Sequence, residues 1–573
     1  MRVALLTEGD RGGAEGRTSA WCDRLVRRLA DHDFEVYAVG PAPGKGAPGV
    51  RSLAVDGPPP AARAPRGRAA RRRFLDAYRD LVAALACGEG PGGHGPDGRQ
   101  AGGDQEDGHR SDGRSRQEDR FSSGLYGLAR YAEQDGGLPA ALRSQEAARA
   151  LEAACRAPGA DRSAASAGPA ALLAACDALE RALRPLSAPW YGPDALGAAD
   201  LCHATCAGPA ALPGLLAAHR LGTPLLVTEY AVRLRAHYLG ARELPPPVRA
   251  LTSAFHRLLA AETYRRAALI TPGDAHIRRW QERCGAPRER LRTVHPGLDA
   301  GGFARVGEAA EAVRGSGGDD AHDGPGPRHA PALLWTGRVE PGKDLVALLH
   351  AFTSIRAQVP GARLHIAHGG PADADYLARC RTLAAQLFPD EAADTRTPGE
   401  NPVVLTDLSA PGAPALADTY AAADLVVLSS AVEGFPVTLV EAMLCGRATV
   451  STDTGAVREV VGGTGLVVPP RNPRALAEAC AALLRDPARR ARLGAAARAR
   501  AVELFSAEQN AAAFRAIYRD LAAGPAPVAA AAPVPFATTA EAVLPAAGIA
   551  GPAPRRPGWA RPRVPATVGG EPA

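Results

Sequence analysis

Residues 332–357, ALLWTGRVEPGKDLVALLHAFTSIRA, carry the clearest fold signal in the chain. Its first part, 332–337, is an apolar run ending in glycine, as in a buried strand. The loop GRVEPGKD (337–344) follows, and 345–357 has the apolar spacing of a helix. A strand that passes through a glycine turn into a helix is half of a βαβ unit and predicts a parallel sheet. The stretch therefore predicts an α/β fold with a charged loop at the carboxyl end of a strand.

The same alternation continues through the second half of the chain and predicts a doubly wound, Rossmann-like domain over 331–505. Ser506, followed three residues later by Gln509, predicts a capped C-terminal helix over 506–522. The alanine- and proline-rich remainder lacks periodicity, which predicts a disordered tail over 523–573. The expected strands are 363–369, 402–407, 425–430 and 448–452, and the expected late helices are 473–486 and 488–504.

The first half shows the pattern again and predicts a second Rossmann-like domain over 1–305. VALLT (3–7), an amphipathic stretch at 21–30 and EVYAVG (35–40) form a βαβ unit. Two such domains facing each other would leave a cleft between the carboxyl ends of their sheets. Further strands are expected at 201–206, 224–230, 268–273 and 291–298.

Two segments are poor in large apolar residues. The glycine-rich, polar stretch at about 88–123 predicts a disordered insertion in the first domain. Residues 306–330 are also polar and rich in glycine, and they predict a flexible linker between the two domains.

Composition excludes several classes of protein. The net charge of +6 over 573 residues is spread widely, which argues against a nucleic-acid partner. No segment resembles a secretory leader or a membrane span, so neither secretion nor membrane insertion is expected. The ten cysteines are scattered, which favours a reducing, cytoplasmic location. Cys202, His203 and Cys206 lack a second ligand pair at zinc-like spacing, so structural zinc is not expected.

The loop after the first strand of the second domain carries two cations. The chain has only two lysines, Lys45 and Lys343, among 67 basic residues, so an ammonium at position 343 stands out. Gly337 permits a close backbone approach, and Arg338 and Lys343 together can hold one diphosphate. The alternative is a surface loop with ordinary charges.

A second cluster, SSAVEGFPVTLVEAM (429–443), follows another predicted strand. Its glycine and proline predict a tight loop and a helix start, with N–H groups that can bind a phosphate. Glu433 and Glu441 lie eight residues apart, too far to act on one atom, but they can bind hydroxyls at separate places on an extended ligand. An ordinary helix start would explain the same residues.

The Glu-x7-Glu element, placed downstream of GRVEPGKD, resembles that of retaining glycosyltransferases of family 4, which have the GT-B fold of two facing Rossmann-like domains. Motifs in the first half resemble the Pel-type exopolysaccharide glycosyltransferases (PelF-like, containing DUF3492). These motifs are TEG (7–9), WCDRL (21–25), HAT (203–205), TEY (228–230), LRAHYL (234–239) and ITPGDAHIRRWQERCGA (270–286).

The resemblance implies roles for individual residues. Arg338 and Lys343 would hold the donor diphosphate, and Glu433 would contact hydroxyls of the donor sugar. Glu441 would bind the ribose. Other donor-binding positions would border the nucleotide or its phosphates: Gly337, Gly369, Gly370, Phe435, Pro436, Val437 and Thr438.

The function implied by the resemblance is transfer of a sugar, glucose or a related hexose, from a nucleotide-sugar to an acceptor hydroxyl with retention. The expected donor is a UDP-sugar, and no metal or other cofactor is expected. The leaving diphosphate would help take the acceptor's proton. The product would be an exopolysaccharide or glycoconjugate, and a membrane-bound export complex is a further candidate partner.

The first domain departs from the Pel-type pattern at two places. Tyr230 follows Glu229 where that branch has histidine, and Gly16 and Arg17 stand where it has paired glycines. These residues and His203 are the candidates for the first domain's side of the cleft. The departures motivate an alternative function, a catalytically impaired protein that binds a nucleotide-sugar or a partner.

Two other enzyme classes fit less well. A dinucleotide-dependent oxidoreductase would need G-x-G-x-x-G after the first strand, and the glycines of TEGDRGGAEGR (7–17) have the wrong spacing. A sugar-nucleotide 2-epimerase shares the GT-B fold, but EGFPVTLVE (433–441) favours transfer.

Overall fold

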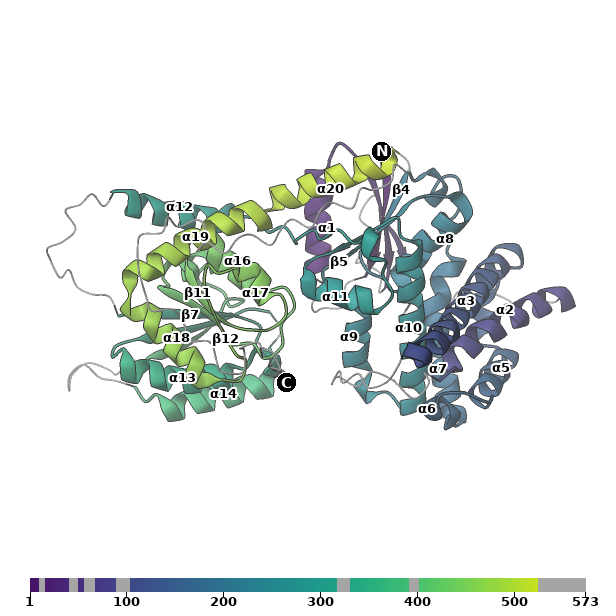
Figure 1. The fold of residues 1–573 in the computed structure, drawn as a ribbon, viewed down its shortest axis with the longest axis horizontal. Coiled ribbons are helices and arrows are strands. Elements are labelled where there is room, and N and C mark those ends of the chain that lie inside the picture. Colours follow the sequence, from purple (N-terminus) through teal and green to yellow (C-terminus); the bar gives the residue numbers. More distant parts are fainter. Residues whose placement is uncertain are drawn as a thin grey trace, which may run out of the picture. The chain divides into compact units, whose positions relative to one another are not determined.

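The computed structural model describes residues 1–9, 16–40, 50–55, 67–88, 104–316, 330–370, 372–390 and 401–523 (Figure 1). For residues 16–19, 104–112 and 313–316 only the course of the backbone is described. The predicted tail from residue 524 onward therefore lies outside the described residues. Within the described ranges, no helix is both long enough and apolar enough to cross a bilayer.

The first half contains a six-stranded parallel sheet with the order β3-β2-β1-β4-β5-β6. Along β1, Val3 and Leu5 pack into one core and Ala4 and Leu6 into another, so both faces of the sheet are buried. Burial of both faces is what a parallel sheet with helices on either side requires. The strands are β1 Arg2–Glu8, β2 Asp33–Val39, β3 Val50–Leu53, β4 Leu201–Ala204, β5 Leu225–Glu229 and β6 Leu269–Pro272.

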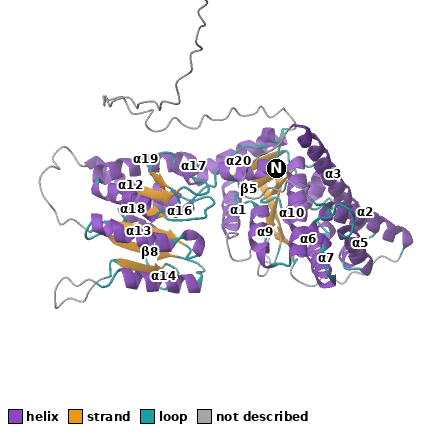
Figure 2. Cartoon of the chain, turned by 60° about the horizontal axis from the view of Figure 1, so that its bottom comes forward, coloured by secondary structure: helices purple, strands orange, loops and turns teal. Residues whose placement is uncertain are grey.

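Most helices of the first half lie in one long crossover between β3 and β4, and several of them pack on α10. Figure 2 shows the strands in orange among the purple helices. The helices are α1 Gly16–Arg28, α2 Arg68–Ala86, α3 Asp104–Gln134, α4 Leu138–Leu142, α5 Gln145–Cys155, α6 Arg162–Ala165, α7 Pro169–Leu183, α8 Leu212–Leu221, α9 Arg233–Gly240, α10 Pro246–Arg266 and α11 Ala275–Arg283.

The prediction of disorder at about 88–123 is wrong for residues 104–123, which form the first two thirds of α3. Phe121, Leu125 and Leu128 are fully buried at helical spacing. Gly124 lies against α2, and a Cβ there would come within 2.5 Å of the backbone nitrogen of Leu81. Glycine, which suggested disorder, therefore permits close packing of two helices. Residues 89–103 lie outside the described part of the chain.

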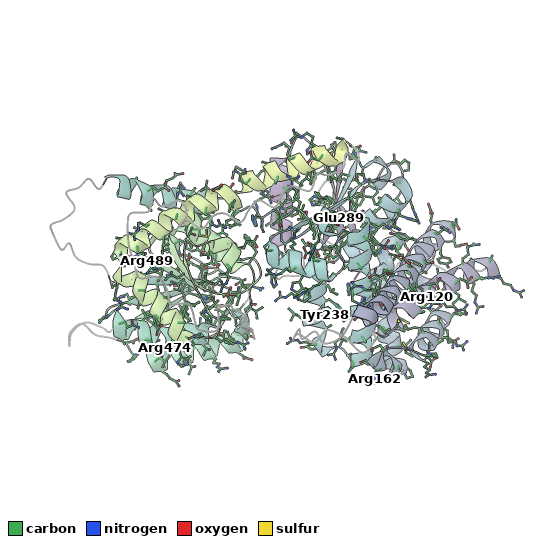
Figure 3. The ribbon with its side chains drawn as sticks, viewed as in Figure 1. Arg120, Arg162, Tyr238, Glu289, Arg474 and Arg489 are labelled. Carbon is green, nitrogen blue, oxygen red and sulfur yellow. The ribbon has the colours of Figure 1, made fainter. Side chains whose placement is uncertain are left out.

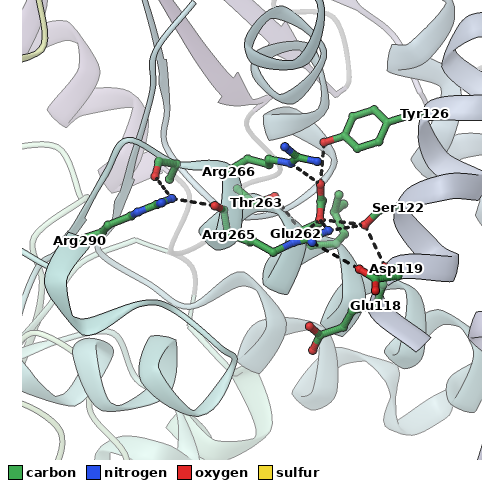
Figure 4. Close-up of polar contacts among 11 residues, drawn as sticks. Glu118, Asp119, Ser122, Tyr126, Glu262, Thr263, Arg265, Arg266 and Arg290 are labelled. Atoms are coloured by element: carbon green, nitrogen blue, oxygen red, sulfur yellow. Dashed lines mark hydrogen bonds and ion pairs between the residues drawn. The ribbon is translucent and has the colours of Figure 1, made fainter. Parts of the chain in front are cut away.

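A buried carboxylate on α10, Glu262, ties α10 to α3 (Figure 4). Its Oε1 accepts hydrogen bonds from the Tyr126 hydroxyl at 2.7 Å and from Arg266 Nε at 3.0 Å. Its Oε2 accepts from the Ser122 hydroxyl at 2.9 Å and pairs with Arg265. A buried charge is tolerated when it is paired and hydrogen-bonded in this way. The network fixes the side chain of Tyr126.

The second half contains another six-stranded parallel sheet, with the order β12-β11-β10-β7-β8-β9. Read from its other edge, this order is β9-β8-β7-β10-β11-β12, which is the connectivity of the first sheet. In each sheet the direction in which successive strands are added reverses between the first and the fourth strand. The predicted α/β class with two doubly wound, Rossmann-like domains is thus confirmed. The strands are β7 Ala332–Gly337, β8 Arg363–His368, β9 Val403–Asp407, β10 Leu425–Leu428, β11 Ala448–Thr452 and β12 Leu466–Val468.

The prediction of a flexible linker over 306–330 is wrong for 306–316, which continue α12 beside α15 and α16. Residues 317–329 lie outside the described part of the chain. The predicted C-terminal helix is confirmed as α20, because the Ser506 hydroxyl accepts from the Gln509 N–H at 3.3 Å and caps it. The helices are α12 Gly301–Ser316, α13 Leu345–Gln358, α14 Ala374–Leu387, α15 Leu416–Ala421, α16 Val437–Leu444, α17 Val457–Val461, α18 Pro473–Arg485, α19 Pro487–Phe505 and α20 Ala507–Ala522.

Nearly all of the predicted strands are present, with ends shifted by a few residues. The strand predicted at 291–298 is wrong, because only isolated bridges at Leu291 and Leu298 occur there. The short edge strands β3 and β12 were not predicted. Both lie at the outer edge of a sheet, where a short pairing needs no long apolar run.

Candidate functional site

The best candidate site lies where the order of the second sheet reverses, between β7 and β10. Two neighbouring parallel strands are followed there by helices on opposite sides of the sheet, which opens a crevice at their carboxyl ends. The loop 337–344 follows β7, and the loop 429–436 follows β10. The topology therefore brings the two clusters predicted from the sequence together.

The two loops meet through an ion pair between Lys343 and Glu433. Lys343 Nζ lies 2.6 Å from Glu433 Oε2, and the two side chains are only 14% and 8% exposed. The Ser430 hydroxyl donates to the same oxygen at 2.9 Å. The Gly434 N–H donates to the other carboxylate oxygen at 3.3 Å. The carboxylate is thus fixed from both sides and shielded from water.

Backbone contacts hold the two loops in this arrangement. The Ser429 hydroxyl donates to the carbonyl of Lys343 at 2.8 Å. The N–H groups of Ala431 and Val432 donate to the carbonyl of Gly342 at 2.9 and 3.1 Å. Asp344, in the left-handed region with φ 48°, caps α13 with its side chain. These contacts position the Lys343 ammonium without using its donors.

The remaining residues predicted from the first loop lie at the same edge. Arg338 forms an ion pair with Glu340 at 3.2 Å and is 35% exposed, so its guanidinium is available to exchange partners. The Gly369 N–H donates to the Gly337 carbonyl at 3.3 Å. Gly370 has φ 74°, and its N–H donates to Ser409 Oγ at 3.2 Å.

Of the residues predicted on and before α16, Glu441 is held by the buried Tyr420. The Tyr420 hydroxyl donates to Glu441 Oε2 at 2.9 Å and contacts the Thr438 carbonyl at 3.1 Å. Phe435 is buried in the core. Pro436 occupies the N-cap position of α16, and the helix begins at Val437.

The first-half candidates form no comparable cluster. Gly16 begins α1, and the side chain of Arg17 is not described. His203 lies within β4 and is fully buried. Its Nδ1 lies 2.7 Å from the Tyr518 hydroxyl and its Nε2 lies 2.6 Å from Thr228 Oγ1. Both ring nitrogens have partners, which favours a structural role over a cleft or zinc-binding role.

We expect His203 to make stability depend on pH. Burial lowers its pKa from 6.5 to about 3 in the folded protein. Between these values the unfolded chain binds a proton that the folded chain does not, so the free energy of unfolding falls as pH falls below the unfolded pKa. From about pH 7.5 to about pH 5.5 the loss from this one group should be about 1.4 kcal/mol.

Urea unfolding at the two pH values, followed by tryptophan fluorescence, measures this loss, because the Trp21 ring lies 5.7 Å from the His203 ring. The variant His203→Gln keeps hydrogen-bonding groups but does not titrate, so its stability should depend less on pH. Equal pH dependence in the two proteins would show that His203 is not the titrating group.

Glu229, another predicted cleft residue, is completely buried and fully bonded. Its Oε2 accepts from the Tyr264 hydroxyl at 2.5 Å and from Gln281 Nε2 at 2.9 Å. Its Oε1 accepts from the Ala207 N–H at 3.1 Å. Burial raises the pKa of Glu229, and these hydrogen bonds offset part of that rise. The carboxyl joins β5 to α10 and α11, which favours a structural role.

Tyr230 contacts α1 and α20. Its ring meets that of Trp21 edge-on, with centroids 5.1 Å apart. Its hydroxyl accepts from Asn510 Nδ2 at 2.9 Å. Gly273 lies against the same ring, where a Cβ would come within 2.5 Å. The Tyr230 side chain thus fills the space between α1, α20 and Gly273, which are distant from one another in the sequence.

The substitution Tyr230→His should therefore destabilise the protein by about 1–3 kcal/mol without raising turnover, because a smaller ring leaves a gap and loses the bond to Asn510. Thermal unfolding and turnover of the same preparation measure both effects. Tyr230→Phe, which removes only the hydroxyl, is the matched control and should cost about 1 kcal/mol. A gain in turnover for Tyr230→His would instead show that tyrosine impairs the enzyme.

Two positions that support the ion pair between Lys343 and Glu433 were not among the predicted site residues. Ser430 lies within the 429–443 cluster, but its hydrogen bond to Glu433 follows only from the geometry of the loop. Gly455, after β11, lies under the backbone of the Glu433 loop with φ 59°. A glycine after a strand was the sole sequence feature that could have indicated it.

Two family models match the chain. Residues 330–486 match the family described as "Glycosyl transferases group 1", so this part of the chain is a glycosyltransferase group 1 domain. Residues 101–289 match "Domain of unknown function (DUF3492)". The second match includes most of the helical crossover and begins within the segment predicted to be disordered.

The curated relatives include D-inositol 3-phosphate glycosyltransferases. The protein from Kineococcus radiotolerans is 30% identical over 305 residues, which cover 50% of this chain and 64% of that protein. The protein from Thermobispora bispora is 32% identical over 292 residues, which cover 50% and 62%. The chain thus spans less than two thirds of the length of these relatives.

Similar solved structures include Anabaena HepE in complex with UDP and glucose, with a TM-score of 0.49 and 14% identity over 91% of this chain and 100% of that one. Another is sucrose-phosphate synthase from Thermosynechococcus elongatus, with a TM-score of 0.47 and 16% identity over the same shares. These likenesses are too distant to indicate a substrate.

Proposed function

We propose that the protein is a retaining glycosyltransferase of the GT-B fold and family 4 that transfers a hexose from a nucleotide-sugar to an acceptor hydroxyl. The observation that carries the proposal is the shielded pair of Lys343 and Glu433 at the crevice between β7 and β10. The group 1 glycosyltransferase domain over 330–486 supports it.

The pair suits the charge that develops during transfer. As the bond between the sugar's anomeric carbon and the diphosphate oxygen breaks, negative charge grows on the diphosphate. The Lys343 ammonium has three donors, and one is used by Glu433 at 2.6 Å, so the others can face this charge. Arg338 supplies a second cation by exchanging its exposed Glu340 partner for phosphate.

In the proposed reaction the acceptor oxygen forms the new bond on the face of the sugar that the diphosphate leaves. The acceptor's proton passes to the departing diphosphate, so charge and atoms balance. Glu433 accepts hydrogen bonds from sugar hydroxyls, and Glu441 accepts those of the ribose. The backbone from Phe435 to Thr438 lies at the start of α16, where N–H groups and the helix dipole favour phosphate.

We infer a UDP-hexose as donor, because the sequence resembles the Pel-type enzymes, and an exopolysaccharide or glycoconjugate as product. A match to DUF3492 supports that branch. The relatives named for D-inositol 3-phosphate suggest a second acceptor class, a phosphorylated polyol. We place the reaction in the cytoplasm, where nucleotide-sugars are made. We propose that the reaction needs no metal, because the protein supplies the cations.

Thermal unfolding of the full chain with UDP, ADP, GDP and their glucose conjugates tests the donor. Ligand at about 100 times its Kd should stabilise the protein by about 2.7 kcal/mol. Release of the nucleoside diphosphate is then measured with polysaccharide, glycolipid and inositol phosphate acceptors. Each measurement is made with and without EDTA. The anomeric configuration of the product is determined by NMR.

Stabilisation by one nucleotide with product of retained configuration, unchanged by EDTA, is expected. Stabilisation without release for any acceptor would favour the alternative function, a catalytically impaired protein that binds a nucleotide-sugar or a partner. Stabilisation by no nucleotide would contradict the proposed reaction and the binding of a nucleotide-sugar, and would leave only the binding of a partner.

A further inference from the structure

A groove on the DUF3492 region carries a second inference. A cavity of about 460 Å³ lies between the C-terminal half of α3, the end of α8 and Tyr191. A neighbouring hollow of about 340 Å³ shares Glu133, Tyr191 and Arg220 as lining residues. We refer to these two adjoining hollows together as the groove, and the larger of them has the volume of ordinary ligand sites.

The groove is separate from the proposed donor site. Helix α8 ends at Leu221, and β5 begins at Leu225. The lining residues at the end of α8 therefore lie toward the amino ends of the first sheet's strands. Lys343 and Glu433 lie at the carboxyl ends of strands in the second sheet. A ligand in the groove would not occupy the donor's place.

The walls of the groove are held rigidly. The rings of Tyr126 and His219 are stacked, with centroids 4.0 Å apart and planes inclined by 20°. Tyr126 is fixed in turn by its bond to the buried Glu262 (Figure 4). The Tyr191 hydroxyl donates to the Pro185 carbonyl at 2.8 Å. Two aromatic platforms are thus preformed, one ending in the exposed ring of His219 and one made by Tyr191.

The charge of the groove is positive. Arg220 pairs with Glu133 at 3.2 Å and lies 5.7 Å from the centre of the Tyr191 ring. Arg130 is exposed and has no hydrogen bond or ion pair to any described residue. Burial, and then the three nearby arginines, lower the pKa of His219, so its ring is neutral near pH 7 and presents an uncharged face.

From this geometry we propose that the groove binds an anionic saccharide. The apolar C–H face of a sugar ring packs on the exposed His219 ring, and Arg130 binds the carboxylate or phosphate with its planar fork. The carboxylate of Glu133 and the exposed Gln134 offer partners to hydroxyls. The proposal assigns a binding function to the DUF3492 region that does not depend on turnover.

Isothermal titration of the full chain tests the proposal with four probes: a hyaluronan tetrasaccharide, glucose 6-phosphate, neutral cellotetraose and inorganic phosphate. We expect binding of one of the two anionic saccharides, weakened about tenfold or more by Arg130→Ala, since a charge-assisted bond is lost. His219→Ala should weaken the same probe. Arg120→Ala is the matched control, because Arg120 is an exposed arginine of the same helix (Figure 3) and should leave binding unchanged.

The tetrasaccharide and glucose 6-phosphate distinguish a carboxylate from a phosphate as the recognised group. Equal binding of cellotetraose, or of inorganic phosphate alone, would overturn the proposal, as would binding that Arg130→Ala leaves unchanged. Binding of no probe at millimolar concentration would overturn it as well. UDP binding measured on the same samples keeps this outcome distinct from a failure of the donor site.

Discussion

Replacing Lys343 by alanine should lower turnover by about 10²–10³, the range found when one electrostatic contact to developing charge is removed. Its ammonium is the only cation paired with Glu433 among the described residues, and both side chains are shielded from water. Shielding strengthens the interaction of the ammonium with a diphosphate, because few water molecules screen it. Steady-state release of diphosphate at saturating donor measures the loss.

Two variants separate this chemical role from a structural one. Lys343→Met keeps most of the apolar stem and removes the ammonium with its charge and donors, so it should lose as much turnover as Lys343→Ala. Arg474→Ala removes a cation from the same domain at a side chain that is 90% exposed (Figure 3), and it should have wild-type activity. Turnover of Lys343→Met within a factor of three of wild type would refute the proposed role.

The ion pair also explains why position 343 holds lysine, one of only two in a chain whose other Lys/Arg positions are all arginine. Lys343 Nζ lies 2.6 Å from Glu433 Oε2, and because the two side chains are only 14% and 8% exposed, the space around the ammonium is confined. A compact ammonium fits such a space and keeps donors free on its other sides, whereas a guanidinium is planar and wider. Lys343→Arg should therefore be impaired although it conserves charge.

The main features of the fold could be predicted because they follow from local patterns. Apolar runs ending in glycine located the strands, and the alternation with helices predicted two parallel sheets. The approach of Lys343 and Glu433 was also predictable, because each follows a strand and carboxyl ends of parallel strands share one edge. Sequence separation of 90 residues did not matter, since the topology brings the loops together.

Other features could not be predicted because their partners are distant in sequence and have no local pattern. His203 bonds to Tyr518, 315 positions away, and Tyr230 bonds to Asn510, 280 positions away, both on α20. Local polarity also misled at 104–123, where a polar segment and glycines hide the buried face of α3. Tertiary packing, and not composition, decides the structure there.

The second large effect is expected for Gly455→Ala. Gly455 has φ 59°, and a Cβ there would lie 2.5 Å from the carbonyl oxygens of both Glu433 and Gly434. The nearest atoms belong to the backbone, so the loop that carries Glu433 must move to make room. A shift of about 1 Å in a catalytic group can cost about 10² in rate, and we expect kcat/KM to fall by this factor.

Gly463→Ala provides the matched control for this substitution. Gly463 also has positive φ, 86°, but a Cβ there meets no atom within 4 Å. Alanine at positive φ is less stable than glycine by about 1–2 kcal/mol, so both variants should lose similar thermal stability for this reason. Only Gly455→Ala displaces the Glu433 loop, so only this variant should lose activity well beyond its loss of stability. Equal activities for the two variants would mean that the position of the loop does not limit the reaction, and that Glu433 does not act where the structure places it.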